Sequence, residues 1–283
     1  MQNAIELQGL KKRLGNFVLG PINLIVPRGC IVGYIGENGA GKSTTIKLLL
    51  NLMIPDQGEI KLLGKDIREF TPQMKKDIAY VFDDLYLPED MTLKNAQNFH
   101  RKFYGQAWQD KTFSELITRF SLPDNKTIKH FSRGMKMQLG LALALSHGAK
   151  LLLLDEATSG LDPVIRDDVL DLLLEYIQNE DHTILVSSHI LSDLEKVADY
   201  IAFIHKGQLL FMEAKDELVD QYGITSLSKE QLAEIDNDAI VGKRSHQFGV
   251  EVMLKRNLVP DDLELEKVSV EDIMVYMIKG ERK

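Results

Sequence analysis

The sequence predicts an α/β fold in which short strands alternate with helices around a central sheet. Short β-like runs alternate with longer segments in which apolar residues recur at three- and four-residue spacing. The run "KLLLLDE" (150–156) is apolar until its acidic end, as expected of a strand that is covered on both faces. The run "CIVGYIG" (30–36) reads as a second buried strand and ends in glycine just before a helical pattern.

The composition is that of an ordinary globular protein, with 44% hydrophobic and 27% charged residues among 283. This length suits one large domain, or one domain with a smaller appendage. The net charge of −8 repels phosphate backbones, so we expect no nucleic acid as a partner. The single cysteine, Cys30, allows no internal disulfide, which fits a reducing cytosol. We expect no signal peptide and, because no apolar run reaches about 18 residues, no transmembrane helix.

The first half of the chain is expected to open with an antiparallel sheet and then to alternate between strands and helices. The expected early strands lie at 4–8 and 17–26, and the buried strand at 30–36 is followed by a helix at 42–53. A turn and strand at 54–64, a strand at 78–82 and a helical region from about 89 to 131 complete this half.

The second half repeats the alternation and then weakens. Ser132 is placed to cap a helix at 132–147, and Pro163 opens a helix at 163–178. Strands are expected at 150–156 and 183–189, and a hairpin around Lys206 and Gly207. Beyond about residue 215 we expect a short helix, a polar stretch from 236 to 247, a strand at 249–256 and a helix at 269–280, which together form a small C-terminal appendage.

The strongest functional motif is "GENGAGKST", Gly36 to Thr44, between a predicted strand and a predicted helix. Its small residues let successive backbone N–H groups wrap the phosphates of a nucleotide, and the following helix directs its positive end toward them. Lys42 would neutralise the β- and γ-phosphates, and the Ser43 hydroxyl would bind Mg²⁺. The residues expected to contact the nucleotide in this loop are Gly36, Asn38, Gly39, Ala40, Gly41, Lys42, Ser43 and Thr44.

Polar residues follow two further apolar runs at the same predicted sheet edge. Asp155 is placed to hold Mg²⁺ through water, and Glu156 to polarise an attacking water, as hydrolysis of a γ-phosphate requires. His189, after the next run, would contact the γ-phosphate or orient that water. The predicted catalytic residues are therefore Lys42, Glu156 and His189, and the cofactors are ATP and Mg²⁺.

These motifs occur in the order that resembles the ATP-binding cassette (ABC) family, the ATPase subunits of ABC transporters. The resemblance covers about residues 4 to 220 and rests on "GENGAGKST", "FSRGMKMQLGLALAL", "LLLLDEATSGLDP" and "SSHIL". It implies a P-loop NTPase fold with a RecA-like core, an N-terminal antiparallel β subdomain and a helical subdomain at about 89–148. Residues 1–220 would form the ATP-binding domain and 221–283 a C-terminal accessory region.

The resemblance also implies roles for residues outside the phosphate loop. "FSRGM" matches the signature motif, usually LSGGQ, so Ser132 and Gly134 would bind the γ-phosphate held by a second cassette. Asp162 closes the matching D-loop, which crosses that dimer interface. The adenine-stacking position matches Leu14, and nearby Phe17 is an alternative or a core residue.

One further position departs from the family pattern. Asp83 stands where the family has the glutamine that contacts Mg²⁺ and water, so it is either a metal ligand or a solvated turn residue. The segment 85–92 after it would face the membrane partner.

The closing "SVEDIMVYMIKGE" resembles the tail of bacterial exporter-type ATPases made separately from their membrane subunit. We therefore expect an ATPase at the cytoplasmic side of the cell membrane, peripheral to it. Its partners would be a multi-helix permease and an identical or different second cassette, bound head to tail. The expected substrates are drugs, antimicrobial or toxin peptides, or similar amphipathic molecules. A soluble ABC ATPase, or a regulatory or sensing cassette, is the alternative.

Overall fold

The computed structural model describes residues 3–82, 84–246, 249–260 and 262–280, which form three β-sheets. The central sheet has the order β10-β9-β3-β8-β7-β6. Its members β3, β6, β7, β8 and β9 run parallel, and β10 pairs antiparallel with β9. Their bounds are β3 (Ile31–Ile35), β6 (Ile78–Val81), β7 (Leu151–Asp155), β8 (Thr183–Ser188), β9 (Tyr200–His205) and β10 (Gln208–Ala214).

The register of this sheet places three of the predicted motifs at one edge. Ile35, the last residue of β3, pairs with Ser188, the last residue of β8. Asp155, the last residue of β7, pairs with Ser187. Because parallel strands end at the same edge, the loops that follow β3, β7 and β8 emerge side by side.

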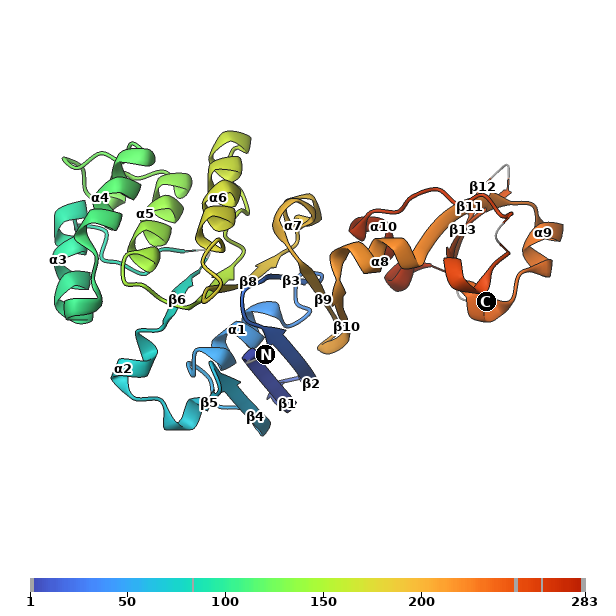
Figure 1. Cartoon of the computed structure of the whole chain (residues 1–283), viewed down its shortest axis with the longest axis horizontal. Helices are drawn as coiled ribbons and strands as arrows, with labels where there is room; N and C mark the ends of the chain where they lie inside the picture. The colour runs from blue at the N-terminus through green and yellow to red at the C-terminus, as the bar shows by residue number, and fades with distance from the viewer. Residues whose placement is uncertain (1–2, 83, 247–248, 261, 281–283) are drawn as a thin grey trace.

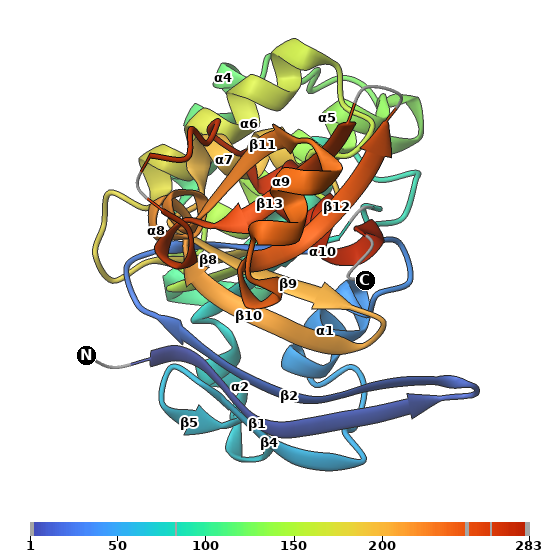
Figure 2. The ribbon, with the colours of Figure 1, turned by 90° about the vertical axis from the view of Figure 1, so that its right-hand side faces the viewer.

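A second, antiparallel sheet contains the N-terminal strands in the order β2-β1-β4-β5. Helix α1 (Lys42–Leu49) lies between this sheet and the central one (Figure 2), and the buried residues Tyr34 and Ile46 share a hydrophobic cluster with β1 and β2. The strands of this layer are β1 (Asn3–Leu14), β2 (Phe17–Pro27), β4 (Gln57–Leu62) and β5 (Lys65–Asp66). The predicted antiparallel opening is therefore confirmed.

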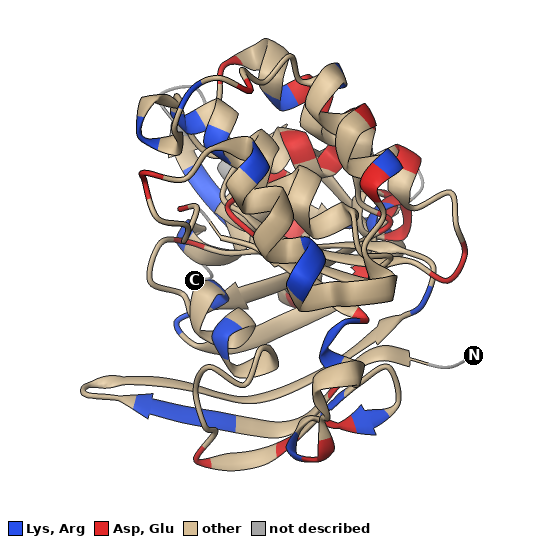
Figure 3. Cartoon of the chain, turned by 90° about the vertical axis from the view of Figure 1, so that its left-hand side faces the viewer, with Lys and Arg blue, Asp and Glu red and all other residues tan. Residues whose placement is uncertain are grey.

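Helices α3 to α7 lie across the central sheet from that layer, whereas the short α2 lies on the same side as β4 and β5 (Figure 1). The helical region expected from 89 to 131 contains two α-helices, and the first of them ends where Gly105 adopts a φ of 58°. Charged residues of both signs are interspersed over these helices on the side drawn in Figure 3. The helices are α2 (Pro72–Lys75), α3 (Leu93–Tyr104), α4 (Asp110–Arg119), α5 (Arg133–Leu145), α6 (Pro163–Tyr176) and α7 (Leu191–Val197).

The C-terminal residues form the third sheet, in the order β11-β13-β12, at the far end of the molecule from α3 (Figure 1). No strand was expected in the polar stretch from 236 to 247, and this expectation is wrong, because the stretch contains β12, which pairs with one side of β13. Strand β11 was also not predicted. The elements are α8 (Lys215–Gln221), β11 (Tyr222–Leu227), α9 (Lys229–Glu234), β12 (Ile240–His246), β13 (Gly249–Lys255) and α10 (Val270–Lys279).

Helix α10 joins this C-terminal region to the central core. It packs against β12, α8 and α7. Its buried residues Ile273 and Tyr276 belong to the same hydrophobic cluster as Leu191 and Leu194 of α7. Short 3₁₀ turns lie at Ile67–Glu69, Gly105–Ala107, Ile128–His130, Asn237–Ala239 and Arg256–Leu258. Among the helices that the structure describes, none has the length and apolar character needed to cross a bilayer.

Candidate functional site

The predicted phosphate loop connects β3 to α1 in a conformation that requires its glycines. Gly39 and Gly41 adopt φ values of 81° and 115°, which side-chain-bearing residues rarely reach. At Gly36 an added Cβ would lie 2.4 Å from the carbonyl oxygen of Ile204 on β9. The first turn of α1 contains no acidic residue, so its positive end is not neutralised by a side chain there.

Lys42 begins α1 with its side chain almost fully buried, at 5% exposure. Its Nζ donates to the Gly36 carbonyl oxygen at 2.8 Å and to that of Glu37 at 3.4 Å. The same ammonium lies 3.2 Å from Oε1 of Glu156. The loop therefore fixes the position of a cation at its centre, which suits binding of a phosphate chain.

Glu156 occupies an unusual backbone position directly after β7. Its φ is 54°, and its amide N–H donates to the Ser187 carbonyl oxygen at 3.1 Å. This arrangement directs its second carboxylate oxygen, Oε2, to within 2.6 Å of Nδ1 of His189. The structure thus brings Lys42, Glu156 and His189, three residues predicted from separate motifs, into one connected group.

Asp155 lies beside this group at the end of β7 and is buried. The Ser187 hydroxyl donates to its Oδ1 at 2.5 Å, which fixes the orientation of the carboxylate. Tyr34 and Thr45 anchor α1 to the sheet through a 3.2 Å hydrogen bond between their hydroxyls, and burial raises the pKa of Tyr34. The Asp155 carboxylate is therefore held in one orientation at the edge of the sheet where α1 begins.

A pocket of about 580 Å³ opens over these groups. Both candidates for the base-contacting position, Leu14 and Phe17, line it, so the sheet of β1 and β2 forms one of its walls. Glu37 and Ser159 also line it; neither is among the predicted site residues, although they lie within "GENGAGKST" and "LLLLDEATSGLDP". The other lining residues are Asn38, Gly39, Gly41, Lys42, Ser43, Thr44, Glu156 and His189.

Some predicted site residues that the structure describes do not line this pocket: Gly36, Ala40, Ser132, Gly134, Asp155 and Asp162. Ser132 caps α5, as its hydroxyl accepts from the Met135 amide at 3.2 Å, and Asp162 caps α6. Gly134 is buried, and an added Cβ would lie 2.8 Å from Cδ1 of Ile165. Their predicted contacts to a second cassette stay predictions. Asp83 lies outside the described residues.

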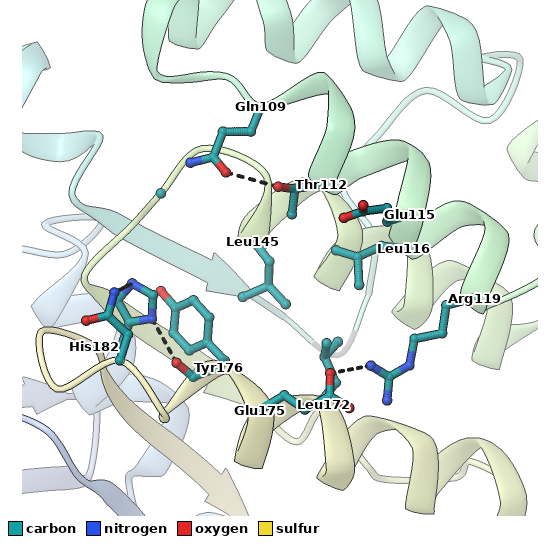
Figure 4. Close-up of a pocket in the computed structure, with 12 residues that line it drawn as sticks. Gln109, Thr112, Glu115, Leu116, Arg119, Leu145, Leu172, Glu175, Tyr176 and His182 are labelled. Atoms are coloured by element: carbon teal, nitrogen blue, oxygen red, sulfur yellow. Dashed lines mark hydrogen bonds and ion pairs between the residues drawn. The ribbon is translucent and has the colours of Figure 1, made fainter.

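A different pocket, of about 510 Å³, separates α4 from α6 (Figure 4). An ion pair between Arg119 Nη1 and Glu175 Oε2, at 2.5 Å, spans it. His182 stacks on Tyr176 at its inner side, with ring centroids 4.0 Å apart. None of the predicted nucleotide-binding residues lines this pocket, so it is a separate cleft beside the helices.

Comparison with known proteins agrees with the geometry of the phosphate-loop site. The family model described as "ABC transporter" matches residues 19–159. The ABC transporter ATP-binding protein YtrB of Bacillus subtilis (strain 168) is 34% identical over 220 residues, which cover 77% of this chain and 74% of that protein. The chain belongs to the ABC transporter family.

Two further comparisons extend this ABC assignment. The bacitracin transport ATP-binding protein BcrA of Bacillus licheniformis is 30% identical over 304 residues, which cover 99% of both chains. A solved structure described as the ATP binding subunit of an ABC transporter matches with a TM-score of 0.69 and 28% identity, over 77% of this chain and 92% of that one. The predicted fold class, a P-loop ABC ATPase, is confirmed, and the chain is an ATP-binding and ATP-hydrolysing ABC transporter subunit.

Proposed function

We propose that Glu156 is the general base of ATP hydrolysis and that His189 holds its carboxylate in place. The observation that carries this proposal is the shared carboxylate, with Oε1 3.2 Å from Lys42 Nζ and Oε2 2.6 Å from His189 Nδ1. Lys42 belongs to the loop that takes the phosphates, so a carboxylate beside it lies next to the γ-phosphate. A carboxylate so placed can accept a proton from an attacking water.

The Lys42–Glu156 ion pair also suggests how binding prepares the site. A triphosphate in the loop would compete with Glu156 for the Lys42 ammonium, because its charge is larger. The released Oε1 would then be available to a water molecule, while the bond to His189 keeps the carboxylate from turning away. Substrate binding and base activation would therefore be the same event.

The polar residues around the loop fit Mg²⁺, which takes few protein ligands and keeps phosphate and water oxygens. Ser43 lines the pocket, and the Asp155 carboxylate has Oδ1 fixed by Ser187. No group of three His, Cys, Asp or Glu side chains suited to a metal occurs among residues 3–82, 84–246, 249–260 and 262–280. Ser43 and Asp155, with Asp83 as the sequence suggests, would hold the ion, which would neutralise charge on the phosphates.

We propose that the subunit works as a dimer of cassettes, arranged head to tail, against a membrane permease. Ser132, Gly134 and Asp162 would then meet the nucleotide and interface of the second cassette, whether identical or different. A groove of about 190 Å³ near Leu85 presents aromatic side chains, with Tyr86 77% and Phe99 52% exposed. We assign this groove to the permease, which would hold the subunit at the cytoplasmic face of the membrane.

The proposed transport process is export of an antibiotic or another amphipathic molecule. This proposal rests on the similarity to the bacitracin transport protein along the entire chain, including the C-terminal region. Residues 1–220 would form the ATP-binding domain, with the helical subdomain at about 89–148, and 221–283 an accessory region. The alternative of a soluble or sensing cassette is not favoured, since this relative is a transport protein.

A substitution of Glu156 tests the proposed base. Glu156→Gln should retain ATP binding and lose at least about 100-fold in turnover, because an amide cannot take the proton. Glu175→Gln, on a distant exposed carboxylate, is the matched control and should hydrolyse ATP normally. Normal turnover by Glu156→Gln would refute the assignment.

A second experiment tests the permease contact. The unmodified protein and a Tyr86→Ala variant are each purified from membranes, and the membrane proteins that co-purify with each are identified.

A further inference from the structure

Helix α7, which follows His189, carries a buried carboxylate that the proposed reaction does not use. Asp193 is 3% exposed, and its Oδ2 has no hydrogen-bond donor within the described part of the chain. The cation beside it is Arg166 of α6, whose Nε lies 3.8 Å from that oxygen. A buried carboxylate without a hydrogen bond is costly, so the charge of Arg166 is what compensates it.

Arg166 also holds the loop that follows Glu156. Its Nη2 donates to the carbonyl oxygen of Leu161 at 3.3 Å. This loop is a series of turns that starts at Glu156, where the Ser159 amide donates to the Glu156 carbonyl oxygen at 3.0 Å. One guanidinium thus contacts both the loop after Glu156 and the helix after His189.

These contacts close a ring around the proposed catalytic pair. At one side of the ring, Glu156 Oε2 and His189 Nδ1 lie 2.6 Å apart. At the other side, Arg166 joins the Leu161 carbonyl to Asp193, and α6 and α7 pack against each other. Neither Arg166 nor Asp193 lines the nucleotide pocket, so neither reaches the substrate directly.

We propose that Arg166 and Asp193 are positioning residues for ATP hydrolysis, which set the separation of the segments that carry Glu156 and His189. This inference rests on the roles proposed above for those two residues. A displacement of about 1 Å at a catalytic group lowers turnover by roughly 100-fold. Loss of the Arg166–Asp193 pair should therefore lower turnover, even though both residues lie outside the pocket.

Two conservative variants of the full chain separate positioning from stability. Asp193→Asn keeps the shape and removes the charge, whereas Arg166→Lys keeps a charge and removes the planar guanidinium that bonds to the Leu161 carbonyl and lies beside Asp193. Each should lower kcat at least about tenfold while KM and the ATP Kd stay within about twofold. Thermal unfolding of both variants is measured in parallel. If one variant is unfolded, the kcat of the folded variant decides the result.

The chain offers a matched control on the same two helices. Lys196 of α7 and Asp167 of α6 form an exposed ion pair at 3.1 Å. Lys196→Met and Asp167→Asn should leave kcat unchanged, because exposed pairs contribute little. The double variant Arg166→Met, Asp193→Leu removes both charges and should recover thermal stability without recovering kcat.

The outcomes distinguish this inference from the proposed function. Folded Asp193→Asn and Arg166→Lys with kcat within twofold of the unmodified protein would overturn the positioning role. If Glu156→Gln is inactive in the same assay, the base assignment survives that result. If Glu156→Gln hydrolyses ATP normally, the base assignment and the positioning role built on it both fall.

Discussion

The ammonium of Lys42 lies 3.2 Å from Oε1 of Glu156, so the group that should bind phosphate is paired with the proposed base. This pairing predicts that Glu156→Gln binds ATP more tightly while hydrolysing it far more slowly. Loss of a partly buried pair worth about 1 kcal/mol corresponds to roughly fivefold in affinity. Equilibrium titration with a fluorescent ATP analogue measures this change. Unchanged or weaker binding would show that Glu156 does not compete with the phosphates.

A second prediction concerns the contact between Arg133 and Gly160. Gly160 has a φ of 69°, and an added Cβ would lie 2.5 Å from Nη1 of Arg133. Gly160→Ala should therefore lower the free energy of unfolding by about 1 kcal/mol, mainly from backbone strain, because the guanidinium is the far end of a flexible side chain and can shift at little cost.

Gly15 provides the control for backbone strain alone. Its φ is 60°, and an added Cβ would meet nothing within 4 Å. Gly15→Ala should cost a similar amount, about 1 kcal/mol, in denaturant unfolding. A much larger loss in Gly160→Ala than in Gly15→Ala would contradict this prediction and would show that the guanidinium cannot shift at little cost.

Phe17 and Leu14, which line the wall expected to contact the adenine, should contribute differently to the affinity for ATP. Phe17 offers an aromatic face, so Phe17→Ala should weaken ATP binding by about tenfold, as expected from the loss of roughly 1–3 kcal/mol of stacking. Leu14→Ala should have a smaller effect. Tripolyphosphate, which lacks a base, is the control ligand in competition titrations. If Phe17→Ala weakens tripolyphosphate binding as much as ATP binding, then Phe17 supports the phosphate loop and does not contact the adenine.

The stability of the protein should fall on mild acidification because burial disfavours the charged form of two histidines, the buried His147 and the partly buried His100. Burial lowers the pKa of His147 from 6.5 to about 4 and that of His100 to about 4. The unfolded chain therefore binds protons more tightly than the folded one. The stability that each histidine contributes is present above pH 6.5 and is lost as the pH falls toward 4.

Between pH 7 and pH 5.5 we expect a loss of about 1 kcal/mol per histidine. His147→Phe keeps the stacking on Tyr104, whose ring centroid lies 3.9 Å away, and removes the proton site. Its unfolding free energy should depend less on pH than that of the unmodified protein. The prediction would be contradicted if the unfolding free energy of His147→Phe changed with pH by the same amount as that of the unmodified protein.

The central part of the fold and of the site could be predicted because the sequence signals there are local. Gly36 to Thr44, Asp155 with Glu156, and His189 each follow an apolar strand, and parallel strands bring such ends to one edge. The Ser132 cap and the Lys206–Gly207 hairpin are likewise short-range patterns, and both are confirmed.

The parts that could not be predicted depend on contacts distant in sequence. Strand β12 carries polar residues, so its own composition resembles that of a loop. It forms a strand because it pairs with β13. The ring through Arg166 and Asp193 joins residues on different helices, and no spacing pattern reveals it. Ser159 lines the nucleotide pocket, whereas Asp162 at the end of the same motif caps α6, and the spacing of the motif does not show which of its polar residues faces the pocket.

The packing of α10 on α7 has a consequence for how the protein is made. The Val270 amide donates to the Glu195 carboxylate at 2.6 Å, and Ile273 and Tyr276 fill the core beside α7. During synthesis, the phosphate loop leaves the ribosome long before these residues do. The part of α7 that α10 covers therefore stays exposed until this later segment has been made. Until then the nascent chain exposes a surface on which chaperones can act.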